Sequence, residues 1–287
     1  MIDSRARHDP PARLRPFVSG YVGYRQDGVP PARHRGLPSP ELTFIVTLDD
    51  PLVIDAHPDA GQPAGSYDTL LGGLHTSPAL VSHPGRWSGV QLGLTPLGAR
   101  TLLGLPAAEL ANWDAEATDV IGGFADRLRE LVVRQPTWAG RFAVIDQLLA
   151  ERATAAAADR PALTRPEVGH AWRRLRETRG GVGVAALATE TGLSARRLGA
   201  LFRAEFGLAP KEAGRVFRFT HARQRIGAAM GGGAATADTF ARLAADCGFY
   251  DQAHLAREFR ALAGCPPSTW LAEEFRFVQA SPADLGE

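Results

Sequence analysis

One pattern of apolar and polar positions occurs twice between Val184 and Trp270. The first copy reads VAALATETGLSARRLGALFRAEFGLAP, and the second reads FARLAADCGFYDQAHLAREFRALAGCPP. Positions before the turn recur at an offset of 56 residues: Leu187, Ala188 and Gly192 correspond to Leu243, Ala244 and Gly248. Positions after the turn recur at an offset of 57 residues: Leu198, Phe202, Arg203, Gly207 and Pro210 correspond to Leu255, Phe259, Arg260, Gly264 and Pro267. Such a repeat predicts one supersecondary unit used twice.

Each copy predicts a helix-turn-helix. An apolar helix stops at Gly192 or Gly248, and glycine accepts the left-handed conformation that ends a helix. A second helix then opens on a capping side chain, Ser194 in the first copy and Asp251 in the second. On a helical projection, the leucines and phenylalanines of this second helix share one side, and its arginines and alanines share the other. Small residues beside long cations suit a helix that enters the major groove of DNA.

The alternative is an ordinary helical bundle whose arginines form a solvated face. A single copy would leave that alternative open. Two copies with the same core stripe, glycine turn, capped helix and outward arginines favour DNA binding.

The repeat resembles the DNA-binding domain of the AraC/XylS family of transcription regulators. The segments that carry the resemblance are LATETGLSARRLGALFRAEFGLAP, FRFTHARQRI and LAADCGFYDQAHLAREFRALAGCPPSTW, within about Arg165 to Phe275. The resemblance implies two recognition helices in successive major grooves on one face of the duplex, with a joining helix that sets their separation. The segment from Lys211 to Met230 would span about 30 Å as a helix, close to the roughly 34 Å of one DNA turn.

We expect base contacts from Arg196 and Arg197 in the first copy and from Gln252, His254 and Arg257 in the second, because such side chains can bond base edges. In the family, an arginine two residues after the recognition-helix leucine reads a base in each unit. Arg257 matches that position, whereas Ala200 occupies it in the first copy, so Arg196 is expected to take the reading role there. The residues expected to contact phosphates are Ser194, Arg203, Arg218, Arg223 and Arg260.

The N-terminal part predicts short strands. Residues 1–40 are proline-rich and expected to be mostly irregular, with a possible first strand at Phe17–Tyr24. The segment Glu41–His57 suggests a hairpin around Asp-Asp-Pro, and strand-like runs follow at Thr69–His75, Ala79–Ser82 and Trp87–Leu94. Short strands at this spacing are typical of a small barrel or sandwich.

After Thr95 the pattern predicts helices: LGARTLLGL, DVIGGFADRLRELVVRQ and AGRFAVIDQLLAERA, the last two packed as a pair. Residues 153–161 are expected to be a linker. Thr164 and Glu167 form a capping-box signature for a helix that reaches Arg179, and its arginines could contact phosphates or form a solvated face. Three glycines, 231–233, should end the joining helix, and the tail after Phe277 should be disordered.

These features predict an α+β protein with two domains. Residues 1–155 would form a cupin-like β-barrel or sandwich with a helix pair, and residues 161–277 an all-α domain with helix-turn-helix units at 184–207 and 239–264. The family resemblance implies that the first domain binds a small-molecule effector and dimerises. Phe44, His75 and Trp87 are candidate liners of an effector pocket, although core packing would also explain them, and residues 118–152 are a candidate dimer surface.

The charge distribution agrees with this division. The net charge of the chain is +1, but residues 165–260 hold 16 basic and 9 acidic residues, a net charge of +7, which leaves −6 for the remainder. A basic module joined to a mildly acidic one is typical of a DNA reader with a separate sensing part. Expected partners are therefore double-stranded DNA, a small-molecule effector, a second copy of the chain, and RNA polymerase if the protein is an activator, which the family resemblance favours.

Other features limit the remaining function classes. No apolar run is long enough for a membrane span, and the N-terminus lacks the apolar core of a signal peptide, so we expect a cytoplasmic protein. Cys247 and Cys265 are expected to be buried fillers rather than a disulfide. His34, His75 and His83 could bind a metal in a cupin-like barrel, but the HxH motif with a following glutamate is absent. We expect no cofactor, metal or catalytic residue; the alternative is a metal-dependent cupin-type enzyme with a helical appendage.

Overall fold

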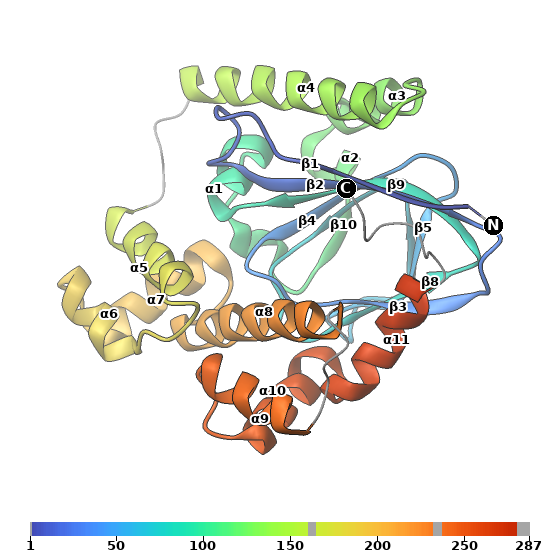
Figure 1. Cartoon of the computed structure of the whole chain (residues 1–287). Coiled ribbons are helices and arrows are strands. Elements are labelled where there is room, and N and C mark those ends of the chain that lie inside the picture. Colours follow the sequence, from blue (N-terminus) through green and yellow to red (C-terminus); the bar gives the residue numbers. More distant parts are fainter. Residues whose placement is uncertain (1, 160–164, 232–236, 280–287) are drawn as a thin grey trace.

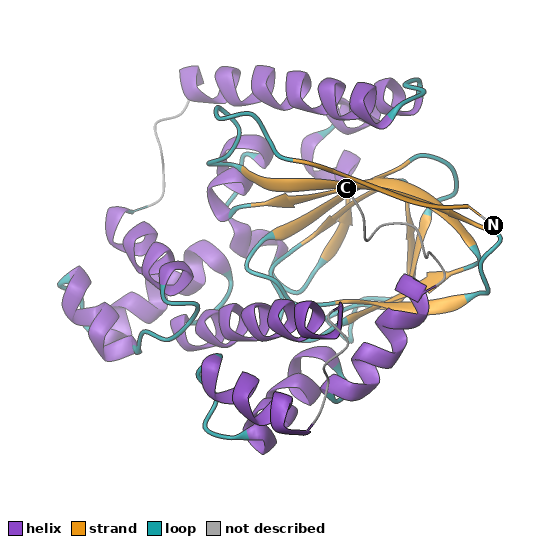
Figure 2. Cartoon of the chain, viewed as in Figure 1, coloured by secondary structure: helices purple, strands orange, loops and turns teal. Residues whose placement is uncertain are grey.

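The computed structural model describes residues 2–159, 165–231 and 237–279. Strands form the N-terminal part and helices the C-terminal part, so the α+β class is confirmed (Figures 1 and 2). The strands are β1 (Ile2–His8), β2 (Val18–Asp27), β3 (Ala32–Gly36), β4 (Leu42–Thr47), β5 (Leu52–Ala56), β6 (Gly65–Tyr67), β7 (Thr69–Gly72), β8 (Ala79–His83), β9 (Arg86–Leu94) and β10 (Asp114–Glu116).

The strands form two antiparallel sheets. The larger sheet has the order β1-β2-β9-β4-β7-β10, and the smaller has the order β3-β8-β5-β6. The four residues of β7 and most of those in β4 are buried, as expected for central strands covered on both faces. The N-terminal part is therefore a two-sheet barrel-like domain, within the architecture that the spacing of short strands predicts.

Two sequence predictions about the strands are wrong. Residues 1–40 are not mostly irregular, because they contain β1, β2 and β3. Nor do β4 and β5 form a hairpin: β4 pairs with β7 and β9, whereas β5 pairs with β6 and β8 in the other sheet. The Asp-Asp-Pro turn crosses between sheets, and its carboxylates bond β9 instead: Asp49 accepts from the hydroxyl of Ser88 (2.5 Å), and Asp50 accepts from Arg86 (2.6 Å).

Helices follow the sheets and cover one of them. The π-helical segment η1 (Ala99–Leu103) follows a short α1 (Pro96–Gly98), and a 3-10 turn η2 (Ala107–Leu110) precedes β10. The predicted helix pair consists of α2 (Ala117–Ile121) with α3 (Gly123–Val133), and α4 (Trp138–Asp159). The pair lies along the larger sheet (Figure 1); Asp146 of α4 accepts a hydrogen bond from the hydroxyl of Tyr21 on β2 (2.9 Å).

The predicted linker at residues 153–161 is wrong for most of its length, because α4 continues to Asp159. Alanine has the highest helix propensity, so the run after residue 153 extends the helix. Thr164 of the predicted capping box lies outside the described residues. So do residues 232–236, which include two of the three glycines predicted to end the joining helix, and residues 280–287 of the predicted tail. The next helix, α5 (Pro166–Glu177), starts with proline at its first position after Arg165, which makes no side-chain cap.

The C-terminal part consists of two helix-turn-helix units. Helices α6 (Val184–Thr191) and α7 (Ala195–Phe206) form unit 1, and α9 (Ala237–Asp246) and α10 (Gln252–Ala263) form unit 2. The long α8 (Pro210–Gly231) joins them, and α11 (Pro267–Gln279) follows. With 22 residues, α8 is about 33 Å long, which confirms the predicted joining helix. Cys247 and Cys265 are buried and free, as predicted.

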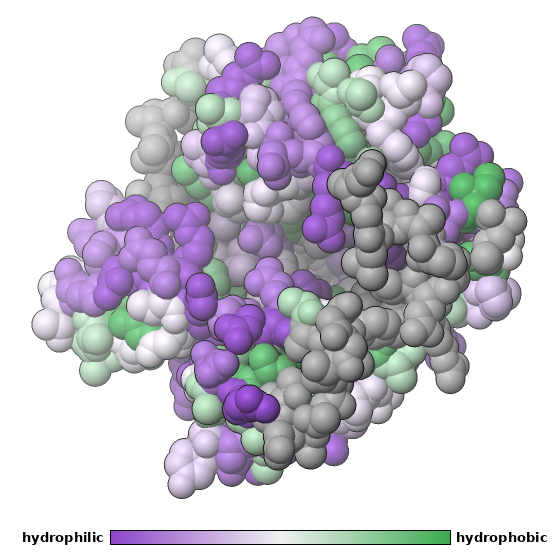
Figure 3. All heavy atoms as spheres, in the orientation of Figure 1, coloured by the Kyte–Doolittle hydropathy of each residue, from purple (hydrophilic) through white to green (hydrophobic). Residues whose placement is uncertain are grey.

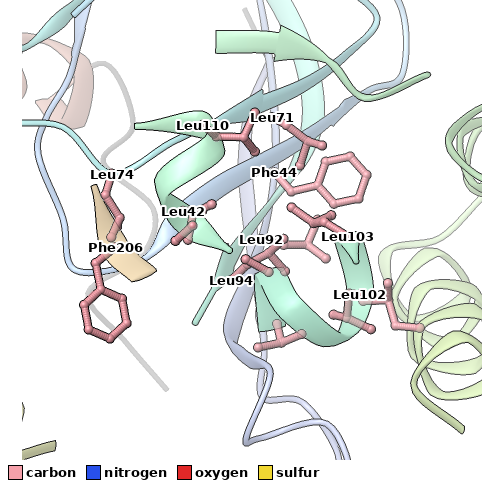
Figure 4. Packing of buried hydrophobic residues seen from close by; sticks show 14 of the residues in the cluster. Leu42, Phe44, Leu71, Leu74, Leu92, Leu94, Leu102, Leu103, Leu110 and Phe206 are labelled. Atoms are coloured by element: carbon pink, nitrogen blue, oxygen red, sulfur yellow. The ribbon is translucent and has the colours of Figure 1, made fainter. Parts of the chain in front are cut away.

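The apolar core does not divide at the boundary between strands and helices. One buried cluster runs from the sheets through α3 and α4 into α5, α6 and α7, and Figure 4 shows Phe206 of α7 together with Leu42 and Leu74 of the sheet domain. Unit 2 has a separate cluster, built from α8 to α11 around Phe219, Leu255 and Phe259. Unit 1 is therefore packed into the N-terminal domain, whereas unit 2 is packed mainly on α8.

Candidate nucleic-acid interface

Helix α7 exposes a cationic face. Ser194 accepts a hydrogen bond from the backbone N–H of Arg197 (3.2 Å), so it caps the helix as predicted. The side with Leu198 is buried, whereas Arg196, Arg197 and Arg203 are exposed on the other side. Figure 3 shows hydrophilic residues gathered over α5 and α7. Unit 1 thus presents three guanidinium groups from the second helix of its motif.

Helix α10 has the same arrangement. Asp251 accepts a hydrogen bond from the backbone N–H of His254 (2.6 Å) and caps the helix. Gln252, Arg257 and Arg260 are exposed, and His254 is half-buried. The predicted base-contact residues Gln252 and Arg257 are therefore exposed like Arg196 and Arg197 of unit 1, whereas His254 is only partly exposed.

Local contacts orient His254. Its Nδ1 accepts a hydrogen bond from the backbone N–H of Tyr250 (3.2 Å), and its ring meets Phe249 edge-on, with the centroids 5.5 Å apart. An imidazole that accepts at Nδ1 carries its proton at Nε2, so that nitrogen is a donor suited to base or phosphate acceptors. Tyr250 itself is 91% exposed immediately before α10. Sequence reasoning missed this tyrosine, although a large aromatic in the turn before a recognition helix was visible.

Some arginines elsewhere in the helical domain have carboxylate partners. Arg174 bonds Glu190 (2.9 Å), and Arg215 of α8 bonds Glu258 (2.8 Å). In contrast, no carboxylate within the described residues forms an ion pair with the five exposed arginines of α7 and α10, which are Arg196, Arg197, Arg203, Arg257 and Arg260. These cations are available to neutralise phosphates or bond bases.

The two phosphate-contact residues predicted on α8 lie on different faces. An added Cβ at Gly180 would lie 3.1 Å from Cγ of Arg218, and one at Gly248 would lie 3.7 Å from its Cδ, so this side chain lies between the segment after α5 and unit 2. Arg223 lies near Glu41 of the N-terminal domain, whose pKa burial raises and the charge of Arg223 lowers. Five residues on a helix correspond to about 140°, so the two arginines do not share a face of α8.

A family model described as a helix-turn-helix domain matches residues 187–273, and one for a domain of unknown function (DUF6597) matches residues 6–116. Residues 187–273 are therefore a helix-turn-helix domain, which agrees with the resemblance of the repeat to AraC/XylS-type regulators. The match covers α7 and α10, the second helices of the two helix-turn-helix units.

Solved structures are similar to the whole chain. Ligand-free ToxT from Vibrio cholerae, a single-residue variant, has a TM-score of 0.52 at 11% identity and covers 93% of this chain and 99% of its own. Wild-type ToxT with a bound unsaturated fatty acid has a TM-score of 0.50 at 10% identity and covers 90% and 95%. The AraC-like transcriptional activator CuxR has a TM-score of 0.30 at 14% identity and covers 77% and 95%. At 10–11% identity the similarity to ToxT concerns the fold alone. No curated protein matches the sequence.

A cleft of about 720 Å³ lies between the helical domain and the sheet domain. Its aromatic lining comes from Trp172 of α5, Phe206 of α7 and Phe217 of α8; the Trp172 ring lies 4.3 Å from that of Phe206 and 5.2 Å from that of Phe217, between centroids. Its cationic lining includes Arg15, Arg165, Arg173, Arg176 and Arg179. Arg173 and Arg176 of α5, and Arg179 after it, are exposed and border this cleft, which agrees with the solvated face that the sequence offered as one of two alternatives.

Polar groups of the cleft are incompletely paired. The hydroxyl of Thr220 is buried and has no hydrogen-bond partner within the described part of the chain. Burial lowers the pKa of His221, and the charges of Arg179 and Arg225 lower it further. Cations, an unsatisfied hydroxyl and aromatic rings in one cavity suit a ligand with an anionic group and an apolar body.

The residues predicted to line an effector pocket do not come together. Phe44 is buried in the main cluster, beside Leu71 and Leu103 in Figure 4. Trp87 packs against a different cluster and donates a hydrogen bond to the side-chain oxygen of Gln26 (2.7 Å). His75 donates from Nδ1 to the carbonyl of Ser77 (2.5 Å). Phe44 and Trp87 instead pack in or against the apolar core, which is the alternative explanation that the sequence offered.

The histidines considered as metal ligands are also dispersed. His83 bonds Gln26 (2.9 Å), and His34 meets Trp87 edge-on, with the centroids 5.9 Å apart. Among the described residues, no group of three or more His, Cys, Asp or Glu side chains is placed to hold a metal ion. No helix in the described ranges is long and apolar enough to cross a membrane.

Proposed function

We propose that this protein is a sequence-specific transcription regulator that inserts α7 and α10 into neighbouring major grooves. The observation that carries the proposal is the repeated unit: each recognition helix is capped, buries one apolar side and exposes arginines with no carboxylate partner in the described chain. The length of α8, about 33 Å, is close to the roughly 34 Å of one DNA turn. The match to a helix-turn-helix family model and the resemblance of the repeat to AraC/XylS regulators support the same function.

Specific contacts follow from this geometry. Arg196 and Arg197 would read bases in one groove, and Gln252, His254 and Arg257 would read bases in the next. Arginine bonds guanine O6 and N7 in a bidentate way, and an Nε2–H donor of His254 suits a purine N7. Ser194, Arg203 and Arg260 would contact phosphates, with either Arg218 or Arg223 from α8.

Selection from a random-sequence duplex library tests the function. The full chain should enrich one bipartite motif with two blocks about one helical turn apart. Affinity for that motif should fall steeply with salt concentration, because several phosphates are neutralised. Enrichment of no motif would contradict sequence-specific recognition, and a salt-independent affinity would contradict contacts by the exposed arginines.

We also propose that an effector binds in the cleft between the two domains rather than inside the sheet domain. The cleft combines the aromatic rings of Trp172, Phe206 and Phe217 with arginines of α5 and the unsatisfied hydroxyl of Thr220. Bound unsaturated fatty acid in a ToxT structure supports an effector with a carboxylate and an apolar chain. Such a ligand would contact both domains and so could change how they are held together.

Ligand-dependent stability tests the effector site. Oleate and aromatic carboxylates should raise the melting temperature of the wild-type chain. At a ligand concentration 100 times Kd, binding should add about 2.7 kcal/mol to the free energy of unfolding. Arg176→Met should reduce this stabilisation, whereas Arg134→Met, on an exposed arginine of α3–α4 remote from the cleft, should not. Equal stabilisation of the wild type and the Arg176 variant would exclude this arginine from the site.

Three further expectations stay predictions: dimerisation through residues 118–152, contact with RNA polymerase, and activation rather than repression. Side chains such as Leu128, Phe142 and Ile145 are buried against the rest of the domain, so a partner would meet the outer faces of α3 and α4. Size-exclusion chromatography with light scattering tests dimerisation. Metal analysis of purified protein tests the alternative of a metal-dependent enzyme.

A further inference from the structure

Both recognition helices end against the N-terminal domain at the same position of the repeat. Gly207 ends α7 and Gly264 ends α10, and each has a positive φ, 72° and 71°. These glycines correspond at the repeat offset of 57 residues. In each unit an arginine of the N-terminal domain reaches this helix end or the segment next to it.

In unit 1 the arginine is Arg100 of η1. Its Nε and Nη2 donate to the two oxygens of Glu205 on α7, at 2.6 and 2.5 Å. Glu205 is 6% exposed, so the ion pair is largely removed from water. An added Cβ at Gly207 would lie only 2.1 Å from Cβ of Ala111, because the end of α7 abuts the segment after η2.

In unit 2 the arginine is Arg35 of β3. Its Nε and Nη2 donate to the two oxygens of Glu273 on α11, at 2.7 and 3.2 Å, and its Nη1 donates to the carbonyl of Ala263, the last residue of α10 (3.3 Å). The same Nη1 would lie 3.3 Å from a Cβ at Gly264. Arg35 therefore holds α10 and α11 together against the N-terminal domain.

The repeat itself marks Glu205 as unusual. The corresponding residue of unit 2 is Leu262, which is fully buried in the core of that unit. A carboxylate at a core position of a repeat is costly without a partner. Its partner here, Arg100, comes from the other domain, so this position serves the contact between domains rather than the fold of the unit.

The two docking points belong to different sheets. Segment η1 follows β9, a central strand of the larger sheet, and β3 is an edge strand of the smaller sheet. The distance between the sheets is set by their packed side chains, which resist change. The N-terminal domain therefore holds units 1 and 2 at two separate fixed points, in addition to the joining helix α8.

We propose that Arg100 and Arg35 are positioning residues that set the separation of the two recognition helices, and hence the base-pair spacing that the protein prefers between its two half-sites. This inference rests on the proposed function, since it presumes that both units bind DNA. It concerns residues that touch no DNA themselves: each acts through the carboxylate that it holds.

Competition binding with the full chain tests the inference. Duplexes carry the selected motif at its native spacing or with one base pair added or removed, and the ratio of affinities is measured for each variant. Arg100→Met and Arg35→Met should each lower the preference for native spacing by about fivefold or more, the lower range of ordinary coupling between sites. The charge-reversed pair R100E with E205R should restore the preference. Arg86→Met, which breaks an exposed pair with Asp50 inside the N-terminal domain, should leave it unchanged.

The possible outcomes separate the two proposals. If the wild-type chain selects no motif, both fail. If it selects a motif but tolerates altered spacing, or if the arginine variants keep the wild-type ratio, the positioning role fails while the function stands. Equal gains or losses of affinity at every spacing would also overturn it. Melting curves identify a variant that does not fold, and the reversed pair then decides the result.

Discussion

Replacing Gly207 with alanine tests the contact between α7 and the N-terminal domain, and Gly192 provides a matched control. Both glycines end helices of unit 1 in the left-handed conformation, with φ of 72° and 66°. A Cβ at Gly192 would meet no atom within 4 Å, whereas a Cβ at Gly207 would lie 2.1 Å from Cβ of Ala111 and 3.3 Å from Cα of Ala108. The two substitutions share their backbone cost and differ in the domain contact.

The magnitudes follow from these distances. Alanine in the left-handed region costs about 1–2 kcal/mol, which is the whole effect expected for Gly192→Ala. A Cβ forced into packed atoms costs about 1–3 kcal/mol more, so Gly207→Ala should lose about 2–5 kcal/mol in total. For domains of a few hundred residues, each kcal/mol lowers the melting temperature by about 2–4 °C.

Urea unfolding of both variants, followed by circular dichroism, measures the difference. The midpoint should fall further for Gly207→Ala than for Gly192→Ala, and limited proteolysis should cut the Gly207 variant faster between the domains. Equal midpoints for the two variants would show that α7 does not abut the segment after η2. A larger loss for Gly192→Ala would refute the assignment of the contact altogether.

Three other substitutions give distinct readouts. Arg257→Ala should cost about 1–3 kcal/mol on the selected motif and flatten discrimination at one base pair; an unchanged base preference in a mutated-site panel would remove Arg257 from base reading. Arg260→Ala should weaken binding to all sequences alike and reduce the slope of log affinity against log salt by about one, so an unaltered slope would argue against a phosphate contact. Burial raises the pKa of Glu41, so the folded protein favours the protonated carboxyl. The free energy of unfolding is therefore fully maintained below the ordinary carboxyl pKa and decreases as pH rises through the raised pKa. The melting temperature of Glu41→Gln relative to wild type should therefore rise as the pH is raised above the ordinary carboxyl pKa of about 4.3, and a constant difference would contradict the raised pKa.

The helices of the C-terminal domain could be predicted from the sequence because the features that define them depend on residues close together in the chain. The caps at Ser194 and Asp251, the glycine turns and the apolar stripes each depend on residues within one or two helical turns, and the repeat doubled every signal. The structure confirms these features. The length of α8 follows from the distance in sequence between the two units.

The pairing of strands that are far apart in the sequence could not be predicted. The segments now β4 and β5 flank a good turn sequence, but they join different sheets because strand partners come from β7, β8 and β9. A pattern of short apolar runs does not encode which strands pair. The early strand β1 was hidden for a similar reason: its sequence, IDSRARH, is polar, since it lies at the edge of the sheet.

The candidate effector site was missed because it lies between domains. The prediction placed it inside the strands, where Phe44 turned out to be core. The cleft instead uses the arginines of α5, which the sequence left divided between phosphate contacts and a solvated face. The contact between the domains did leave a signal in the sequence: Glu205, which bonds Arg100 outside the cleft, occupies a position where the second repeat has Leu262.

Hydroxyl-radical footprinting of the full chain on its selected duplex tests the central claim most directly. Two recognition helices joined by α8 on one face of the DNA should protect two segments about one helical turn apart, with the intervening backbone open on the far side. Arg196→Ala with Arg197→Ala should erase one segment, and Arg257→Ala with Arg260→Ala should weaken the other. A single protected segment, or two on opposite faces of the duplex, would contradict the account.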